Sequence, residues 1–314
     1  MNLRKIKNSI PIFRKLPGPR KIKRLLSRRN LREVRLRYLM HHNQKAYSDY
    51  LYKQQFGYGI DWKHPRDLNE WIHYLAFKTD TTEWTRLADK YEVRHFVEDR
   101  GLSNILLQLY GVWDKVADIN FDTLPDSFVI RTNCSCGDTI IVENKEKVDS
   151  EIIKENLQNA LIQRDAIFLR SAEPHYLKIK QHIICEQLIK PIPVEYKFFC
   201  FHGKPLCVLA CSNRDLKAHT VDWMLYDLDW KRRDDWMAPK YRKDIVIEKP
   251  LNLKTMIEYA GVLSKGFPHV RVDLYAPDNH VYFGEMTFTS TSSRIDWCTP
   301  EFLKTMGEKV KEGL

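Results

Sequence analysis

The sequence predicts an α+β fold, with a mainly helical N-terminal part followed by a part built from short strands. First, apolar residues recur at helical spacing in two stretches before residue 120. Second, after Leu124-Pro125, short β-branched and aromatic runs alternate with turn residues. Third, a chain of 314 residues with 43% hydrophobic content is long enough to bury a sizeable core.

Two helices are expected in the first part. Asp67-Leu68-Asn69-Glu70 has the spacing of a capping box and precedes an apolar stripe, so a helix should begin there. A second apolar stripe runs from Thr82 to Arg100, and Gly101 follows, a residue that tolerates the left-handed conformation at a helix end. We therefore expect one continuous helix over 82–100.

The second part should hold strands and two helices before a terminal helix. The predicted strands cover 128–132, 139–144, 182–188 and 224–228, with two hairpins that pair 195–201 with 205–211 and 270–275 with 280–288. Helices are expected over 149–163 and 252–265, and Thr299-Pro300 opens a terminal helix with a cap and a first-turn proline. These boundaries predict four regions, namely an arm at 1–45, a helical region at 46–120, a core at 121–298 and a terminal helix at 299–314.

Positive charge is concentrated at the N-terminus. Residues 1–40 hold fourteen Lys or Arg and one acidic residue, and subtracting this +13 from the total of +10 leaves −3 for the rest. Basic and apolar residues interleave over residues 20–37, a pattern typical of a basic amphipathic helix on an anionic membrane surface, although a solvated helix packed on the protein has the same pattern. Because the excess lies in one arm rather than on a folded face, nucleic-acid binding is disfavoured.

The sequence shows neither an apolar run long enough to span a membrane nor the apolar region of a secretory signal. We therefore expect a cytoplasmic protein, peripheral at the inner face of the membrane if the arm binds lipid. The seven cysteines show no CxxC pairing with histidines, which disfavours a zinc site and predicts mostly buried, reduced thiols.

The 270–288 hairpin carries the clearest candidate site. Strand alternation places Arg271 and Asp273 on one face of the first strand, and Glu285 and Thr287 on one face of the second, so pairing would bring all four together. Two carboxylates with room for water and phosphate oxygens are the ligands that Mg2+ prefers. An arginine beside them can stabilise an oxyanion or acyl phosphate. A solvent-facing, salt-bridged hairpin is the alternative.

Two further elements suit a nucleotide. The strand that ends at Arg131 leads into a turn of small residues that includes Ser135 and Gly137, where backbone N–H groups can bind phosphate. The strand that ends at Glu186-Gln187-Leu188 can present backbone groups to an adenine edge, and Lys197 follows within reach of phosphate or substrate. Each element alone is equally typical of an ordinary hairpin or a buried strand.

The chain resembles the TupA-like (teichuronopeptide biosynthesis) ATP-grasp family. The resemblance rests on several motifs that occur in one order: Asp67-Leu68-Asn69-Glu70, Leu87-Ala88-Asp89-Lys90-Tyr91-Glu92-Val93-Arg94, Leu124-Pro125 with Phe128-Val129-Ile130-Arg131, Glu195-Tyr196-Lys197-Phe198-Phe199-Cys200-Phe201-His202-Gly203, and Arg271-Val272-Asp273 with Phe283-Gly284-Glu285-Met286-Thr287-Phe288.

This resemblance implies an ATP-grasp fold, in which two α+β subdomains hold ATP. It implies that Arg131 and the Ser135–Gly137 loop bind phosphate, that Glu186 to Leu188 bind adenine, and that Asp273, Glu285 and Thr287 hold Mg2+. Arg271 would stabilise the acyl phosphate, and Lys197 would contact phosphate or substrate. Arg131 replaces the usual lysine and Thr287 replaces a frequent asparagine; arginine binds phosphate with a more rigid fork.

The implied activity is that of an ADP-forming carboxylate–amine ligase. It would join an amino acid or amine to a carboxylate-bearing sugar or polysaccharide precursor during surface-polysaccharide assembly. A sugar-nucleotide glycosyltransferase using Asp227-Leu228-Asp229 is a rival, as is a sugar kinase with the same nucleotide site. Trp223, Tyr226, Trp230 and Trp236 could stack on a sugar or simply pack in the core.

Overall fold

The computed structural model describes residues 28–134, 137–215, 218 and 220–313. The chain divides into two compact units, the first ending at Tyr47 and the second running from Ser48 to Leu314. In the first unit, α3 (Arg28–His42) is the described part of the basic arm, and the division falls within α4 (Gln44–Phe56). The rest of the predicted membrane-surface segment, residues 20–27, lies outside the described residues. None of the described helices combines the length and hydropathy that a membrane span requires.

The second unit begins with the helix that the capping box predicts. In α5 (Leu68–Lys78), the Glu70 backbone N–H donates to Asp67 Oδ1 at 3.0 Å. The terminal helix α10 (Pro300–Lys311) starts after Thr299, as predicted, and packs against α5. Gly307 permits this packing, because a Cβ there would lie only 2.7 Å from the backbone carbon of Asp67.

The continuous helix predicted over 82–100 is wrong. The structure has two short helices, α6 (Thr82–Ala88) and α7 (Val93–Asp99), separated by a turn. Asp89 makes this turn: its side chain accepts from the Tyr91 N–H at 2.8 Å, and its carbonyl accepts from the Val93 N–H at 2.9 Å. These bonds offer the backbone an alternative to a continuous helix.

The first sheet has four antiparallel strands in the order β1-β4-β2-β3. Its strands are β1 (Leu109–Trp113), β2 (Phe128–Thr132), β3 (Ile140–Val142) and β4 (Ile183–Glu186). The last three lie within the predicted ranges, whereas β1 lies in the region predicted to be helical. Helix α8 (Ser150–Ser171) packs on this sheet through Ile153 and Leu157, and it continues past its predicted end at 163.

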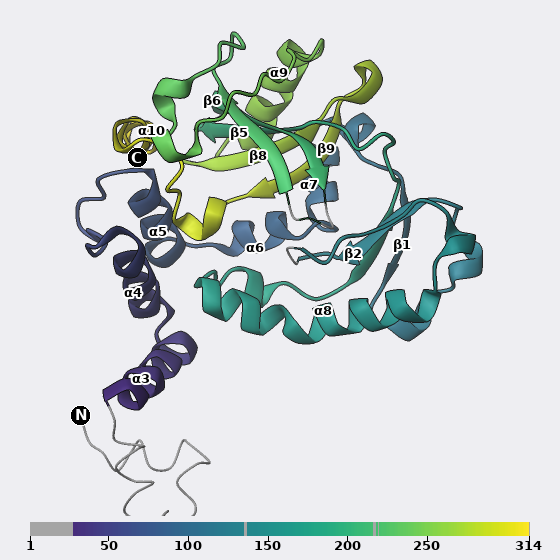
Figure 1. The fold of residues 1–314 in the computed structure, drawn as a ribbon, viewed down its shortest axis with the longest axis horizontal. Coiled ribbons are helices and arrows are strands. Elements are labelled where there is room, and N and C mark those ends of the chain that lie inside the picture. The colour runs from purple at the N-terminus through teal and green to yellow at the C-terminus, as the bar shows by residue number, and fades with distance from the viewer. Residues whose placement is uncertain (1–27, 135–136, 216–217, 219, 314) are drawn as a thin grey trace, which may run out of the picture. The chain divides into compact units, whose positions relative to one another are not determined.

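The second sheet has five antiparallel strands in the order β7-β6-β5-β8-β9. They are β5 (Glu195–Phe201), β6 (Lys204–Asp215), β7 (Thr220–Tyr226), β8 (Val270–Tyr275) and β9 (Tyr282–Thr287). Both predicted hairpins are therefore confirmed, as is the helix predicted over 252–265, observed as α9 (Leu253–Ser264). In Figure 1, α6 and α7 run between this sheet and the layer formed by β1, β2 and α8.

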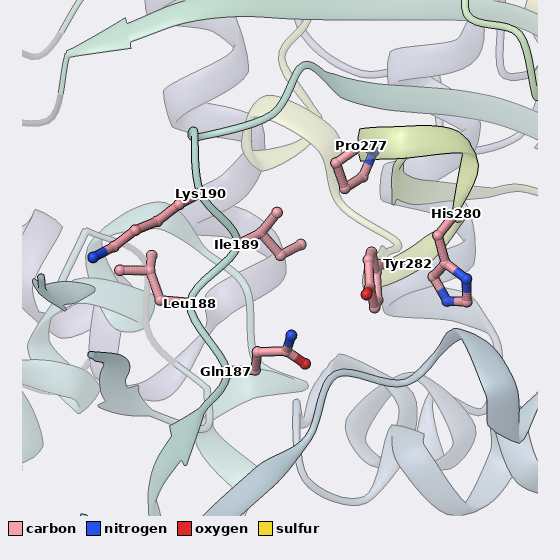
Figure 2. Close-up of a pocket in the computed structure, with 7 residues that line it drawn as sticks. All are labelled: Gln187, Leu188, Ile189, Lys190, Pro277, His280 and Tyr282. Atoms are coloured by element: carbon pink, nitrogen blue, oxygen red, sulfur yellow. The ribbon is translucent and has the colours of Figure 1, made fainter. Parts of the chain in front are cut away.

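The segment between β4 and β5 connects the two sheets and lines a cavity of about 330 Å³. Figure 2 shows Gln187, Leu188, Ile189 and Lys190 on this connection, across from side chains of the β8–β9 turn and of β9. The cavity therefore lies where the chain passes from one sheet to the other.

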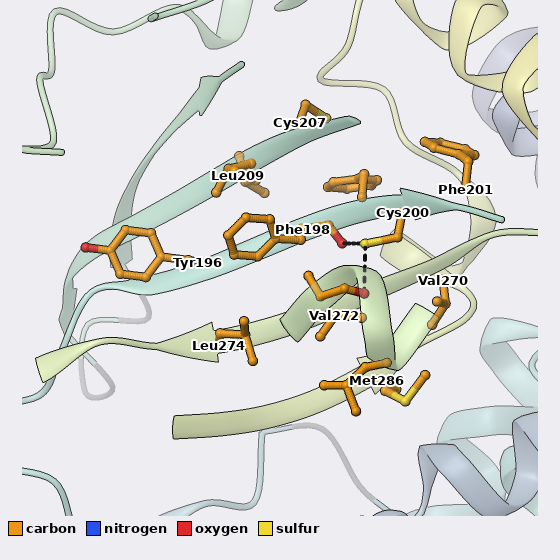
Figure 3. Close-up of a cluster of buried hydrophobic side chains, with 14 of the residues drawn as sticks. Tyr196, Phe198, Cys200, Phe201, Cys207, Leu209, Val270, Val272, Leu274 and Met286 are labelled. Carbon is orange, nitrogen blue, oxygen red and sulfur yellow. Dashed lines mark hydrogen bonds between the residues drawn. The ribbon is translucent and has the colours of Figure 1, made fainter. Parts of the chain in front are cut away.

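Alternation along the strands of the second sheet separates an apolar face from a polar one. Tyr196, Phe198 and Cys200 of β5 are buried on the apolar face, beside apolar residues of β8 (Figure 3). The Cys200 thiol donates to the Ala260 carbonyl of α9 at 3.8 Å, so α9 covers this face. The six described cysteines are free and buried, as predicted for them, and Cys136 lies outside the described residues.

Candidate active site

The second sheet presents a group of polar side chains on the face opposite α9. This group, called the charged face below, consists of Glu195 and Lys197 on β5, Arg271 and Asp273 on β8, and Glu285 and Thr287 on β9. The strand register places Lys197 opposite Asp273 and Asp273 opposite Glu285. The hairpin therefore brings its four predicted residues together, and Lys197 joins them from the neighbouring strand.

A β-bulge at Gly284 sets the direction of the β9 side chains. Leu274 pairs with Phe283, whereas Asp273 pairs with Glu285, so Gly284 is the extra residue. A Cβ on Gly284 would lie 2.9 Å from the Tyr275 ring and 3.0 Å from the Asp273 carbonyl oxygen, which explains the glycine. The bulge lets Phe283 enter the apolar core while Glu285, two residues later, lies on the charged face.

Asp273 is fully buried and lies between two cations. Arg271 donates to its two oxygens in a fork, from Nε to Oδ1 and from Nη2 to Oδ2, both at 2.7 Å. Lys197 Nζ donates to Oδ2, also at 2.7 Å. A buried carboxylate needs such charged partners, and the paired arginine fork fixes its orientation.

Glu285 is the more open of the two carboxylates, with 32% of its side chain exposed. Its Oε1 accepts from Arg271 Nη2 at 3.1 Å and from the Thr287 hydroxyl at 3.0 Å, and its Oε2 lies 3.1 Å from Lys90 Nζ. Burial acts to raise the pKa of Glu285, but Lys90, Arg271 and Lys197 outweigh burial and hold that pKa well below its ordinary value. Glu285 is therefore a carboxylate at neutral pH.

Glu195 extends the charged face toward the cavity. Its Oε2 lies 2.9 Å from Lys197 Nζ and accepts from Arg214 Nη2 at 2.7 Å, while its Oε1 accepts from the Tyr275 hydroxyl at 3.2 Å. Burial opposes ionisation of Glu195, yet Lys197 and Arg214 lower its pKa. Burial likewise acts against the charge on Lys197, and Asp273 and Glu195 reverse this and raise the pKa of the lysine. The ion pairs between Glu195 and its cationic neighbours therefore stabilise the charged forms of Glu195 and Lys197.

Two cations near the site come from the turn after α6 and the first residues of α7, a segment to which the sequence analysis gave no site role. Lys90 pairs with Glu285, and its backbone N–H donates to the Asn133 carbonyl at 2.8 Å, just beyond β2. Arg94, on the same segment, lies 3.3 Å from Glu186 of β4. The segment therefore contacts both sheets. The signal was present in the Leu87–Arg94 motif, where Asp89 and Glu92 also have capping-box spacing.

Arg131 lies on the first sheet and is held by Glu186. Its Nη2 donates to Glu186 Oε2 at 2.8 Å, and its Nε is buried without a partner among the described residues. Burial opposes the charge on Arg131, but Glu186 and Tyr275 raise its pKa, with a smaller contribution from Glu285 of the second sheet. Arg131 thus carries a donor available to an acceptor that enters between the sheets.

Of the three residues predicted to contact adenine, two line the cavity and one forms ion pairs. Gln187 and Leu188 line the cavity, together with Ile189, Lys190, Pro277, His280 and Tyr282 (Figure 2). The Glu186 side chain instead pairs with Arg131 and Arg94. Of the predicted phosphate loop, Gly137 has a positive φ of 89° and is exposed, and Ser135 lies outside the described residues.

The donor set of the charged face fits a magnesium ion shared with phosphate. Among the described residues, no group of three or more His, Cys, Asp and Glu side chains is placed to hold a metal on its own. Asp273 and Glu285 are adjacent across β8 and β9, and two carboxylates leave the remaining positions to phosphate and water. The Thr287 hydroxyl also accepts from Arg271 Nη2 at 3.0 Å, so it links Arg271 to Glu285.

A loop rich in hydroxyl groups follows β9. Thr291, Ser292 and Ser293 all have positive φ values, a conformation that non-glycine residues adopt only when surrounding contacts hold it. Glu173 supplies two of these contacts by accepting from the hydroxyls of Thr289 and Ser292. Arg271 Nη1 lies 3.5 Å from the Ser290 hydroxyl, which places the loop beside the charged face.

The residues of the rival glycosyltransferase hypothesis form a turn and a packed aromatic group. Asp227 Oδ1 accepts from the backbone N–H groups of Asp229 and Lys231 at 3.1 and 2.8 Å. Tyr226 stacks on Trp230 with ring centroids 4.3 Å apart, and Trp236 stacks on Phe302 at 4.1 Å. These contacts favour packing over sugar stacking.

No curated protein matches the sequence. Solved structures that resemble the chain include D-alanine–D-alanine ligase from Bacillus anthracis complexed with ATP, at 17% identity over 73% of this chain and 67% of that one, with a TM-score of 0.43. Another is L-amino acid ligase from Bacillus licheniformis, at 15% identity over 81% of this chain, which spans 57% of the ligase, with a TM-score of 0.46. A third is ATP-grasp ligase PsnB complexed with a variant of its minimal precursor, Mg and ADP, at 10% identity over 94% of this chain and 76% of that one, with a TM-score of 0.40.

The family match is the more direct finding. The model of the TupA-like ATP-grasp family matches residues 70–311, which is more than three quarters of the chain. The match extends from α5 through α10 and includes both sheets and every residue of the charged face. It confirms the predicted fold class and the predicted enzyme class, an ATP-grasp ligase. The chain belongs to the TupA-like ATP-grasp family.

Proposed function

We propose that this protein uses ATP to activate a substrate carboxylate as an acyl phosphate and then transfers the acyl group to an amine, releasing phosphate and forming an amide. The observation that carries this proposal is the charged face itself: two carboxylates suited to a metal lie among Lys90, Lys197 and Arg271, in a member of an ATP-grasp family.

The nucleotide is proposed to bind between the sheets. The cavity beside Gln187 and Leu188 would take the adenine, because its lining combines apolar side chains with the ring of Tyr282, which suits a flat heterocycle. Tyr282 in this cavity pairs across the sheet with Tyr275, which in turn pairs with Glu195. The triphosphate would then extend along the charged face toward Arg271, with Arg131 facing it from the first sheet.

Phosphoryl transfer needs mainly positioning and charge stabilisation. Lys197, Lys90 and Arg131 would bind phosphate oxygens, and Arg271 would orient the attacking carboxylate and stabilise the acyl phosphate. Magnesium, held by Asp273 and Glu285, would neutralise charge on the phosphates. Thr287 would keep Arg271 and Glu285 in register through its hydroxyl.

The proposed acceptor is a carboxylate-bearing sugar or polysaccharide precursor, and the proposed donor of the amine is an amino acid or amine. The loop from Thr289 to Ser293 supports this choice, since it follows β9 directly and its Ser290 hydroxyl lies 3.5 Å from Arg271, where a substrate with both hydroxyl groups and a carboxylate could be bound. The family resemblance supports a role in surface-polysaccharide assembly.

The test is ADP release by the purified protein with ATP, Mg2+, and a panel of uronic-acid sugars combined with amino acids. Wild type should release ADP and phosphate only when both substrates are present. Glu285→Gln should lose this activity, whereas Glu151→Gln, a control at an exposed ion pair with Lys154, should keep it. ADP released with the sugar alone would indicate a kinase, and failure to bind ATP would refute the proposed activity.

The basic arm is proposed to hold the enzyme at an anionic membrane surface on the cytoplasmic side. Among described residues of α3, Leu31, Val34 and Tyr38 are exposed and follow one stripe of the helix, amid several arginines. Co-sedimentation with phosphatidylcholine vesicles, with and without phosphatidylglycerol, tests this. Binding only to the anionic vesicles, weakened by Leu31→Ser and by salt, is expected; equal binding to both would refute it.

A further inference from the structure

Lys90 occupies one oxygen of a proposed metal ligand. Its ammonium lies 3.1 Å from Glu285 Oε2, and only 11% of its side chain is exposed. The other oxygen, Oε1, accepts from Arg271 and Thr287. Both oxygens of Glu285 therefore have partners, and a metal ion that binds at Oε2 would take the place of Lys90.

Lys90 is the partner best able to move. Arg271 is held by two bonds to Asp273 and one to Thr287, and Lys197 bridges two carboxylates. Within the described part of the chain, Lys90 pairs with a single carboxylate. A lysine ammonium on a flexible stem can change acceptors by rotating its side chain, whereas a forked arginine cannot.

The backbone of Lys90 stays fixed while its side chain does this. Its N–H donates to Asn133, and Asp89 closes the turn through the backbone N–H groups of Tyr91 and Val93. Asn133 also precedes the predicted phosphate loop. The ammonium can therefore exchange Glu285 for a phosphate oxygen without any change in the turn.

We propose that Lys90 couples metal binding to nucleotide binding: its ammonium covers Glu285 Oε2 until a nucleotide phosphate attracts it away, so that a divalent ion binds tightly only together with nucleotide. This inference rests on the proposed nucleotide and metal site but not on the identity of the acceptor. Without nucleotide, a metal ion must compete with the Lys90 ammonium for Glu285. When nucleotide binds, its phosphate draws the ammonium away from Glu285 and ends this competition.

The experiment measures Mn2+ binding by electron paramagnetic resonance, with and without ADP, for wild type, Lys90→Gln and Lys90→Arg. In the absence of ADP, Lys90→Gln should bind Mn2+ about tenfold more tightly than wild type, and the gain on adding ADP should shrink by the same factor, because coupling is reciprocal. Lys90→Arg, which keeps the charge, should behave like wild type. Lys154→Gln, at the exposed pair with Glu151, is the matched control and should change nothing.

Equal Mn2+ affinity of Lys90→Gln and wild type without ADP would overturn the coupling and make the Lys90–Glu285 pair a purely structural contact. Circular dichroism checks the fold, and Lys90→Met is a second neutral variant that carries the same test. If the wild type releases ADP in the ligase assay but its Mn2+ affinity does not depend on ADP, only the coupling is refuted. A wild type that binds neither ADP nor Mn2+ with ADP refutes the proposed site as well.

Discussion

Lys197→Met tests whether the charged face is held together by its ion pairs. Lys197 Nζ lies 2.7 Å from Asp273 Oδ2 and 2.9 Å from Glu195 Oε2, and just 13% of its side chain is exposed. Methionine keeps most of the length and apolar contact of the lysine but removes the ammonium. After the change, Asp273 keeps Arg271 and Glu195 keeps Arg214.

The loss should be about 3 kcal/mol of unfolding free energy, the lower end of the cost of removing one partner of a buried ion pair. The lower end applies because each carboxylate retains an arginine. For a chain of this size, that corresponds to a fall in Tm of roughly 4–5 °C. Lys154→Met, which breaks an exposed pair with Glu151, should cost less than about 1 kcal/mol.

Urea unfolding followed by tryptophan fluorescence measures both variants. The loss in the double variant Lys197→Met/Asp273→Asn should be smaller than the sum of the two single losses, because each single change already removes the same ion pair. If Lys197→Met is as stable as wild type, or if the double variant loses the sum of both single losses, the two residues do not stabilise each other as ions and the reasoning is refuted.

Three other outcomes are expected. Glu285 and Glu195 have folded-state pKa values below their ordinary ones, so the stability they contribute is complete above the unfolded pKa of about 4.3 and is lost as the pH falls through the folded pKa values. The difference in unfolding free energy between wild type and Glu285→Gln should therefore stay constant from pH 8 to about 5 and shrink below about 4.3. Urea unfolding at each pH measures this difference. Gly284→Ala should destabilise by about 1–3 kcal/mol in thermal unfolding, because its Cβ meets a ring and a carbonyl; an unchanged Tm would contradict the bulge. Glu186→Gln should weaken ADP binding about tenfold by calorimetry, since Arg131 loses its orienting partner; equal affinity would contradict that role.

The hairpin with Arg271, Asp273, Glu285 and Thr287 was predictable because period-two alternation is a local property of a strand. The pairing of Asp273 with Glu285 confirms that prediction. The bulge at Gly284 was not predictable from alternation, since it depends on the approach of the neighbouring Tyr275. The metal, nucleotide and catalytic roles of these residues stay predictions until the binding and activity experiments are done.

The first sheet was harder to predict. Strand β1 has intermediate burial throughout and lies at the edge of its sheet, so Leu109–Trp113 shows no clear alternation of apolar and polar residues. It pairs only with β4, which follows more than seventy residues later, and such a partner cannot be deduced from local pattern. The prediction of a continuous helix over 82–100 was wrong for a related reason. The apolar stripe continues across the short turn at Asp89, so the pattern of apolar residues does not reveal the break.

That turn explains why the site needs the N-terminal helices. In a continuous helix through Asp89, residues 90 and 94 would lie on the same face of the helix, because they are four residues apart. The break instead lets Lys90 reach Glu285 on the second sheet and Arg94 reach Glu186 on the first. Glu186 also orients Arg131, so one short segment positions cations on both sides of the proposed nucleotide site. Disrupting the turn without altering Lys90 or Arg94, as in Asp89→Ala, should therefore weaken ADP binding and destabilise the protein together. Asp80→Ala also removes one carboxylate, but an exposed one that bonds only its neighbour Thr82 among the described residues, and it should leave ADP binding unchanged.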